Sequence, residues 1–156
     1  MRNKKLIFIL LIILFSSLSL SHQFSRREIS LRISPLSINF PPANPDLVPL
    51  IPAESQIIVE MFISGNEGRS WQLTVLADGD LRAHKGEKIP IENISWTGSP
   101  SPPFVNGSLN KRKPQLVASG QGNINLNGQL NFFLRNSWNY RAGEYSQTVI
   151  FTLSSL

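Results

Sequence analysis

The chain has 156 residues, no cysteine and a formal charge of +5 at pH 7, with 41% hydrophobic and 16% charged residues. The absence of cysteine excludes disulfide bonds, thiol catalysis and cysteine-ligated zinc. A chain of this length suits one domain with a single hydrophobic core, which is stabilised by packing and hydrogen bonds alone.

The first residues are typical of a secretory signal peptide. Arg2, Lys4 and Lys5 precede an unbroken apolar run over residues 6–15, and a serine-rich stretch over residues 16–21 offers small residues for cleavage. About ten strongly apolar residues are too few to cross a bilayer, which takes roughly 20. We therefore expect a signal helix over residues 1–21 and a secreted domain over residues 22–156 without a stable membrane span. An anchor that stays uncleaved is the alternative.

Cleavage also changes the charge. Residues 1–21 contain three cations and no acidic residue, so their removal lowers the formal charge from +5 to +2. Nucleic-acid binding needs a concentrated basic surface. The densest basic cluster is Lys111, Arg112 and Lys113. We therefore expect no nucleic-acid partner.

Alternating apolar and polar residues predict strands in the first half of the secreted domain. Ile29, Leu31 and Ile33 begin an edge strand that Pro35 interrupts and residues 36–40 continue. The following prolines predict a surface connection up to Pro52. Two further strands are predicted, a central one over residues 56–64, which is apolar on both faces, and one over residues 70–75, with Trp71 and Leu73 on a core face.

The second half contains fewer clear strands. Residues 88–97 predict an edge strand that carries Trp96, and the Gly, Pro, Ser and Asn residues of 98–128 predict long loops with one short strand. Strand character returns at residues 130–134, and residues 145–154 predict a last strand in the interior of its sheet. The sequence therefore predicts an all-β fold, a single antiparallel, immunoglobulin-like β-sandwich in preference to a barrel.

Three local patterns occur in a meaningful order. They are Leu36–Phe40 after Ser34-Pro35, Gly68–Val75 with Trp71-Gln72-Leu73, and Ala142–Tyr145 before Val149–Ser154. Together they resemble the WxL domain of bacterial cell-surface proteins over most of the secreted chain. The second motif of that family departs here, because Phe151-Thr152-Leu153 has Phe in place of Trp.

The resemblance implies an extracytoplasmic, envelope-facing role, with non-covalent attachment to peptidoglycan. Similar Ser-Pro-Leu-x-Ile-x-Phe openings and Gly-x-Tyr endings occur in immunoglobulin-like pilus and spore-coat subunits, which implies an assembly role. Tyr145 is expected to cap a sandwich corner with its hydroxyl on a backbone group.

Aromatic and basic residues are the candidate ligand-binding sites. Trp71 is either a core residue or part of a sugar-binding platform. Trp96 and Trp138 lie near predicted loops or bends, so they are the better candidates for exposed stacking surfaces. Lys111, Arg112 and Lys113 either bind anionic wall polymers or form an ordinary solvated loop.

Catalytic and metal-binding patterns are sparse. Asp78-Gly79-Asp80 resembles a fragment of a calcium loop, but two carboxylates are too few for such a site, so we expect a turn. His84 is the one serious candidate for a general base, because the other histidine of the secreted chain, His22, lies at the expected cleavage point. We expect no enzyme, no metal and no cofactor.

The predicted function is therefore non-catalytic. The chain is expected to be a secreted or cell-envelope β-sandwich protein that binds peptidoglycan, another wall polymer or another surface protein. The alternative is a pilus- or coat-like structural subunit that adds a strand to a partner's sheet edge. In that alternative the isolated segment Glu28–Phe40 swings to a neighbouring subunit on the proline-rich connection.

Overall fold

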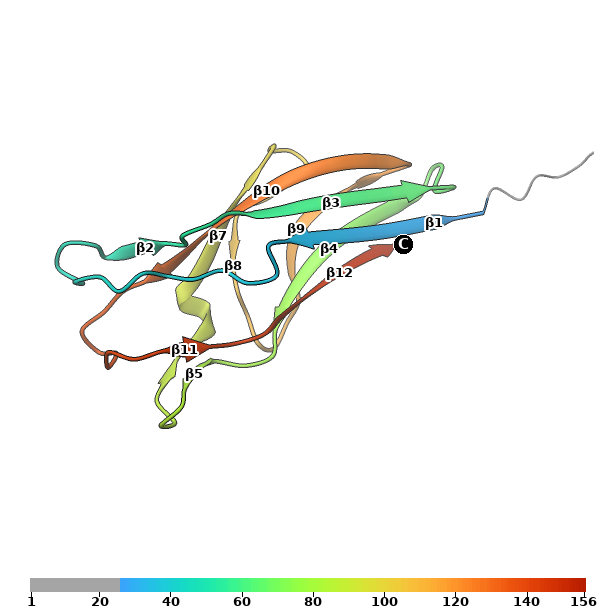
Figure 1. The fold of residues 1–156 in the computed structure, drawn as a ribbon. Coiled ribbons are helices and arrows are strands. Elements are labelled where there is room, and N and C mark those ends of the chain that lie inside the picture. The colour runs from blue at the N-terminus through green and yellow to red at the C-terminus, as the bar shows by residue number, and fades with distance from the viewer. Residues whose placement is uncertain (1–25) are drawn as a thin grey trace, which may run out of the picture.

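The computed structural model describes residues 26–156, so the expected signal helix over residues 1–21 lies outside the described residues. The described chain is all-β, and all of its strand pairs are antiparallel. Two sheets pack face to face as a β-sandwich, and a small third sheet lies toward one end (Figure 1). The predicted all-β, antiparallel sandwich is confirmed.

The larger sheet has six strands. Five follow one another in space, and the sixth, β2, also pairs with β10. The order is β1 (Glu28–Ser34), β3 (Ile57–Ser64), β10 (Ile124–Arg135), β7 (Ile94–Ser99) and β8 (Gly107–Ser108), with β2 (Leu50–Pro52) beside the end of β10.

The other two sheets have three strands each. The second layer of the sandwich has the order β12 (Val149–Ser155), β4 (Ser70–Ala77) and β9 (Gln115–Gln121). The small third sheet has the order β11 (Tyr145–Ser146), β5 (Leu81–Ala83) and β6 (Lys88–Ile89). A 3-10 turn, η1 (Ile91–Asn93), leads from β6 into β7.

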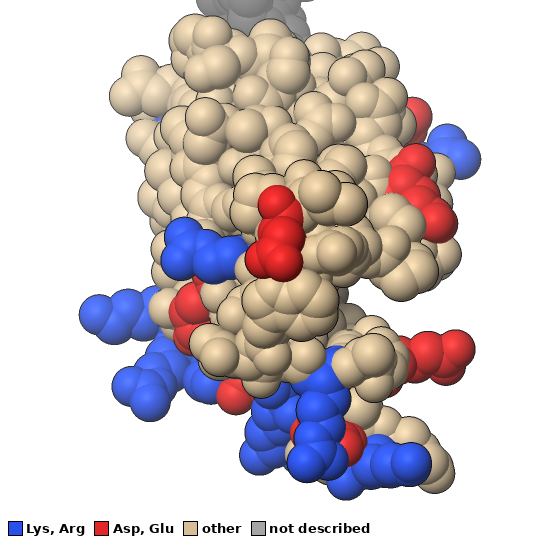
Figure 2. Space-filling view, turned by 90° about the vertical axis from the view of Figure 1, so that its left-hand side faces the viewer, with Lys and Arg blue, Asp and Glu red and all other residues tan. Residues whose placement is uncertain are grey.

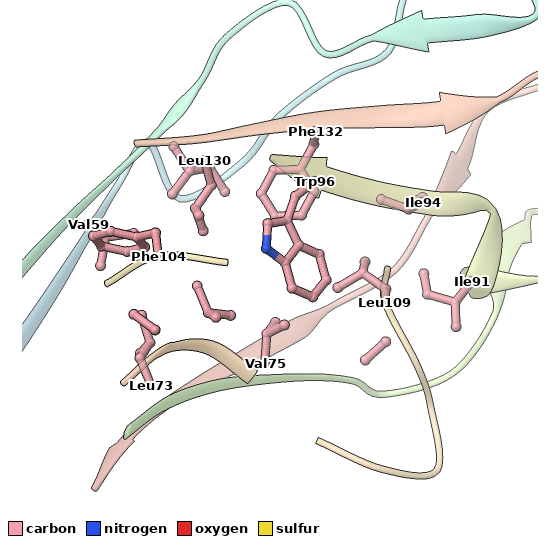
Figure 3. Packing of buried hydrophobic residues seen from close by; sticks show 14 of the residues in the cluster. Val59, Leu73, Val75, Ile91, Ile94, Trp96, Phe104, Leu109, Leu130 and Phe132 are labelled. Carbon is pink, nitrogen blue, oxygen red and sulfur yellow. The ribbon is translucent and has the colours of Figure 1, made fainter. Parts of the chain in front are cut away.

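The core lies between the two large sheets. Strands β3 and β4 turn alternate side chains inward, and these are buried, as at Val59 and Val75. Leu130 and Phe132 of β10 and Trp96 of β7 fill the same layer (Figure 3). The alternation of period two that the sequence shows in these strands therefore marks the buried face.

Three large aromatic side chains of the core pack directly on glycines of neighbouring strands. A β-carbon on Gly120 would lie 2.6 Å from the Trp71 ring, and one on Gly107 would lie 2.5 Å from the Trp96 ring. A β-carbon on Gly128 would overlap the ring of Phe104, which is fully buried. The absence of a side chain at these glycines makes room for the aromatic rings.

One buried polar residue joins several turns. Asn66 is fully buried, and its backbone N–H donates to Oδ1 of Asn123 at 2.8 Å. Its side-chain amide donates to the carbonyls of Arg69 and Gly122, each at 3.2 Å, and its Oδ1 accepts from the hydroxyl of Ser155. The turn after β3, the turn after β9 and the end of β12 are therefore fixed to each other.

Several sequence predictions are confirmed and others are wrong. Residues 28–34 form an edge strand, and β3 lies in the middle of its sheet, as predicted. The strand does not continue over residues 36–40: Leu36 is 92% exposed, and only Ile38 and Phe40 pack against the core. The prolines that flank this segment remove backbone donors, which explains why it lacks a strand partner.

The second half contains more strand than predicted. Residues 98–128 include β8, the seven-residue β9 and the start of the twelve-residue β10. The polar residues Asn125 and Asn127 lie on the exposed face of β10, where pairing with β3 outweighs their low strand propensity. The predicted edge strand over residues 88–97 is two strands separated by η1, and β7 lies inside its sheet.

The position predicted for the last strand is also wrong. β12 was expected in the interior of its sheet, but it pairs only with β4 and forms an edge. Strand pairing decides this position, because β4 pairs with β12 on one side and with β9 on the other. Residue type does not report it, since Ile150 and Thr152 on the exposed face would suit an interior strand of a sandwich equally well.

We predict that Gly128→Ala destabilises the fold by about 3 kcal/mol, because a β-carbon there collides with the buried ring of Phe104. Gly143→Ala is the matched control, since its new β-carbon makes an ordinary 3.6 Å contact with Tyr145. This control should change the free energy of unfolding by less than about 0.5 kcal/mol. Urea denaturation measures both, and equal stabilities of the two variants would contradict the packing described for Phe104.

Candidate functional site

The outer edge of β12 carries unpaired main-chain groups. The N–H of Leu156 donates to the carbonyl of Ser70 at 2.8 Å, which fixes the hydrogen-bonded pairs between this segment and β4. Such pairs alternate along an antiparallel ladder, so the N–H and C=O groups of Val149, Phe151 and Leu153 point away from β4. In the part of the chain that the structure describes, no strand pairs with them. This side of β12 is a free sheet edge.

This free edge lacks the usual protection against strand pairing. Natural edges are commonly protected by charged residues, prolines or bulges. Val149–Ser155 contains no charged residue, no proline and no glycine. Edge strand β1 differs, because it carries Arg32, which lies 3.6 Å from Glu60 of β3 on the exposed face.

The opposite edge of the same sheet is covered. Residues 103–105 run along the outer side of β9, where the N–H of Val105 donates to the carbonyl of Val117 at 2.9 Å. The N–H of Ser119 donates to the carbonyl of Pro103 at 3.4 Å. Because this segment continues into β8 of the other sheet, the sandwich is closed by main-chain bonds on this side.

On the open side, β1 and β12 lie side by side, one from each large sheet (Figure 1). Their inward side chains are only partly buried, and Ile29 is 40% exposed, whereas the inward residues of β3 and β4 are buried. We call this row of side chains the open seam. It consists of Ile29, Leu31, Ile33, Val149, Phe151 and Leu153.

The residues that carry the WxL resemblance lie on two paired strands. Leu153 of β12 is the register partner of Leu73 of β4, and Phe151 is the partner of Val75. Trp71 is 3% exposed and Leu73 is fully buried, so both belong to the core. Trp71 therefore does not offer an exposed face for a sugar ring, and the core alternative is confirmed.

Trp96 is not an exposed stacking surface, so that expectation is wrong. Its side chain is 1% exposed and lies between the two sheets (Figure 3). Its indole N–H donates to the carbonyl of Val105 at 2.9 Å, and its ring centroid lies 6.1 Å from the ring centroid of Phe132. The expectation assumed an edge strand, whereas β7 lies between β10 and β8.

Trp138 is exposed, as predicted. Its side chain is 68% exposed, and its indole N–H donates to Oδ1 of Asp46 at 2.9 Å. The adjacent Leu47 is 79% exposed. Asn136 directly follows β10 and fixes the loop that contains Asp46 and Leu47, because its side-chain amide donates to the carbonyl of Val48 at 3.1 Å. The structure thus presents one predicted aromatic residue to solvent on a fixed loop.

The predicted basic cluster is divided. Lys111 Nζ contacts both carboxylate oxygens of Asp80 at 2.6 Å, whereas Arg112 and Lys113 are exposed. On the face that Figure 2 shows, Lys and Arg side chains gather toward one end, with acidic side chains among them. Only Arg112 and Lys113 of the cluster stay available to an anionic ligand.

Asp80 is a structural junction that joins several segments. Besides Lys111, its carboxylate accepts from the N–H of Ile91 at 3.1 Å, and its carbonyl accepts from Nε2 of Gln147 at 2.7 Å. The hydrogen bond from Lys111 lowers the pKa of the Asp80 carboxyl. Among residues 26–156, no group of three His, Asp or Glu side chains is placed to hold a metal ion.

Two further predicted residues are Tyr145, which is half-buried and packs against the core, and His84. The hydroxyl of Tyr145 donates to the carbonyl of Arg141 at 3.0 Å, so its expected bond to a backbone group is confirmed. His84 is exposed in the turn between β5 and β6. A shallow hollow nearby does not include it and is lined by Asp78, Arg82, Ser146, Gln147 and Thr148.

No helix within residues 26–156 is long and apolar enough to cross a membrane. No protein-family model and no curated protein matches the chain.

We predict that Asp80→Asn costs about 1 kcal/mol of stability at pH 7, because it removes the ion pair with Lys111. The pKa of Asp80 is lowered in the folded state, so the ion pair stabilises the fold above the ordinary carboxyl pKa. This contribution is lost as the pH falls through the lowered folded value. Wild type should therefore lose more stability than Asp80→Asn between pH 7 and pH 3.

Urea denaturation at several pH values measures this difference. Asp78→Asn is the control, because Asp78 is exposed and lies in the same turn. It should follow the wild-type pH dependence. Parallel curves for wild type and Asp80→Asn would show that the ion pair does not stabilise the fold.

Proposed function

We propose that this chain is a non-catalytic, exported β-sandwich protein that binds another protein by accepting an extended strand along β12. The observation that carries the proposal is the contrast between the two edges of one sheet. The edge at β9 is covered by residues 103–105, whereas the edge at β12 is uncharged and has no strand partner among residues 26–156.

Backbone recognition would supply most of the affinity. In strand addition the main-chain hydrogen bonds provide affinity, and pockets for alternate side chains provide specificity. The outward groups of Val149, Phe151 and Leu153 provide the donors and acceptors. The open seam provides the apolar contacts, since its side chains are only partly buried. The best ligand is therefore an extended segment with apolar residues at alternate positions.

The expected export signal supports a partner outside the cytoplasm. Residues 1–21 have the pattern of a secretory leader, and the resemblance to WxL domains favours the cell envelope. A surface protein is a partner of the required kind. A pilus- or coat-like assembly uses the same edge, so strand addition unites both predicted roles.

The strand donor predicted from sequence has a different position in this fold. The segment Glu28–Phe40 is the isolated arm of the sequence prediction, but its first part, β1, pairs with β3 of its own chain from Glu28 to Ser34. The Glu28–Phe40 segment is therefore not free in the described structure. The proposal accordingly places the binding site on an acceptor edge, β12, and not on a donor arm.

Wall-polymer binding has less support from the structure than from the sequence. One of its two stacking candidates, Trp96, is buried, and Lys111 is paired with Asp80. This alternative now depends on Trp138, Arg112 and Lys113. Binding of a peptide strand at β12 does not involve any of these three residues.

The test uses the chain without residues 1–21 and a fluorescent octapeptide, Lys-Thr-Val-Thr-Val-Thr-Val-Lys. Val149→Pro removes one outward N–H without removing a hydrogen bond to β4, so it should weaken peptide binding at least tenfold. Val149→Ala keeps that N–H and loses comparable side-chain contacts. It should weaken binding less than threefold.

Fluorescence anisotropy measures both affinities, and circular dichroism confirms that each variant is folded. The absence of saturable binding by the monomeric wild type would contradict the proposal. Equal weakening by the two Val149 variants would also contradict it, because the effect would then not depend on the main-chain donor.

A further inference from the structure

We propose that the strand accepted by β12 is β12 of a second copy of this chain, in an antiparallel pair centred on Phe151. This inference rests on the proposed function and names the partner at the same edge. The exposed loop at Trp138 and the basic cluster do not contribute to it. Four features of the strand favour a second copy.

The first feature is the direction of the main-chain groups. Residues 149, 151 and 153 direct their N–H and C=O groups outward, since the intervening residues bond to β4. With a two-fold axis at Phe151, Val149 of one copy lies opposite Leu153 of the other. Each outward N–H of one copy at these three positions then faces an outward C=O of the other copy and can donate to it.

The second feature is the order of the side chains. About Phe151 the strand reads Val149 and Ile150 on one side and Thr152 and Leu153 on the other. Pairing around the two-fold axis therefore sets aliphatic Val149 opposite Leu153 and β-branched Ile150 opposite Thr152. It also brings the two Phe151 rings together, and aromatic and β-branched cross-strand pairs are favourable.

The third feature is charge. In a pair of identical strands, each residue lies close to the same residue of the other copy or to one of its sequence neighbours. A charged residue would therefore lie near a like charge, which is destabilising. Residues 145–156 contain no Lys, Arg, Asp or Glu. Two copies of β12 can therefore approach without electrostatic repulsion. The edge at β1 is less suited to such a pair, because it carries Glu28 and Arg32.

The fourth feature is closure. In a two-fold pair both copies use the same edge, so the assembly stops at a dimer and does not extend into a fibre. The second layers of the two sandwiches would join into one sheet of six strands, since each contributes the three strands β12, β4 and β9. The free edge of β12 is then covered in each of the two copies.

The first experiment is sedimentation equilibrium of the chain without residues 1–21. The wild type should dimerise at micromolar to high-micromolar concentrations. Thr152→Lys places a cation on the exposed face of β12, close to the same cation of the other copy. It should raise the dimer dissociation constant at least tenfold. Thr152→Glu should do the same, and an equimolar mixture of the two variants should form dimers again.

Thr97→Lys is the matched control. Thr97 is exposed on β7 of the other sheet, so its substitution should leave the dimer intact. A dimer that Thr152→Lys does not weaken would overturn the inference, because another surface would then join the copies.

The second experiment fixes the register. Because the chain has no cysteine, Ile150→Cys and Thr152→Cys each introduce a single thiol. The proposed pair places residue 150 directly opposite residue 152, so a mixture of the two variants should form a disulfide between copies on oxidation. Each variant alone should cross-link at least fivefold more slowly, since its two thiols lie diagonally across the pair.

The outcomes separate this inference from the proposed function. The wild type could stay monomeric at 200 µM and still bind the octapeptide, with weaker binding by Val149→Pro than by Val149→Ala. This result would overturn the inference that the partner is a second copy, but it would support strand acceptance at β12. A chain that neither dimerises nor binds the peptide would overturn both.

Discussion

Each strand at the edge of a sheet leaves half of its main-chain donors and acceptors without a strand partner, and this constraint governs the whole sandwich. In the layer made of β12, β4 and β9, one edge is satisfied within the chain. Residues 103–105 bond to β9 and carry the chain across to β8. The other edge, at β12, has no such cover among the described residues. The proposed function follows from this asymmetry.

The closed side depends on the packing of Phe104. Its ring is fully buried against Gly128 of β10, which holds the 103–105 segment beside β9. Trp96 lies in the same region, and its indole N–H donates to the carbonyl of Val105. Side-chain packing and main-chain bonding thus support each other there. On the open side, Phe151 is only partly buried and Ile29 is exposed, so a further strand could still cover apolar surface.

Sequence patterns predicted the fold class and the strands whose faces differ most. The alternation through Trp71 and Leu73 identified a core face correctly, because burial of one face of a strand produces a period of two. The long strand β10 was underestimated. Its first half is rich in Asn and Gly, and it forms a strand through pairing with β3 and through the fit of Phe104 on Gly128, which local propensity does not report.

The candidate site was the part least accessible from sequence. Whether a strand lies at an edge depends on which segments pair, and β12 has enough apolar residues to suggest an interior position. Its lack of charged residues suggested the same position, because natural edge strands commonly carry charge. Similarly, the proximity of Trp96 to a predicted loop suggested exposure, whereas the flanking strands bury it. The Asp80–Lys111 pair joins residues far apart in sequence, so no local pattern revealed it.

The central claim is that the outer groups of β12 are free in a single copy of this chain. Amide hydrogen exchange of the dilute monomer, followed residue by residue, tests it most directly. The account predicts rapid exchange at Phe151 and Leu153, whose N–H groups point outward, and slow exchange at Ile150 and Thr152, whose N–H groups bond to β4. Equally slow exchange at all four amides would contradict the account, because the edge would then already be covered.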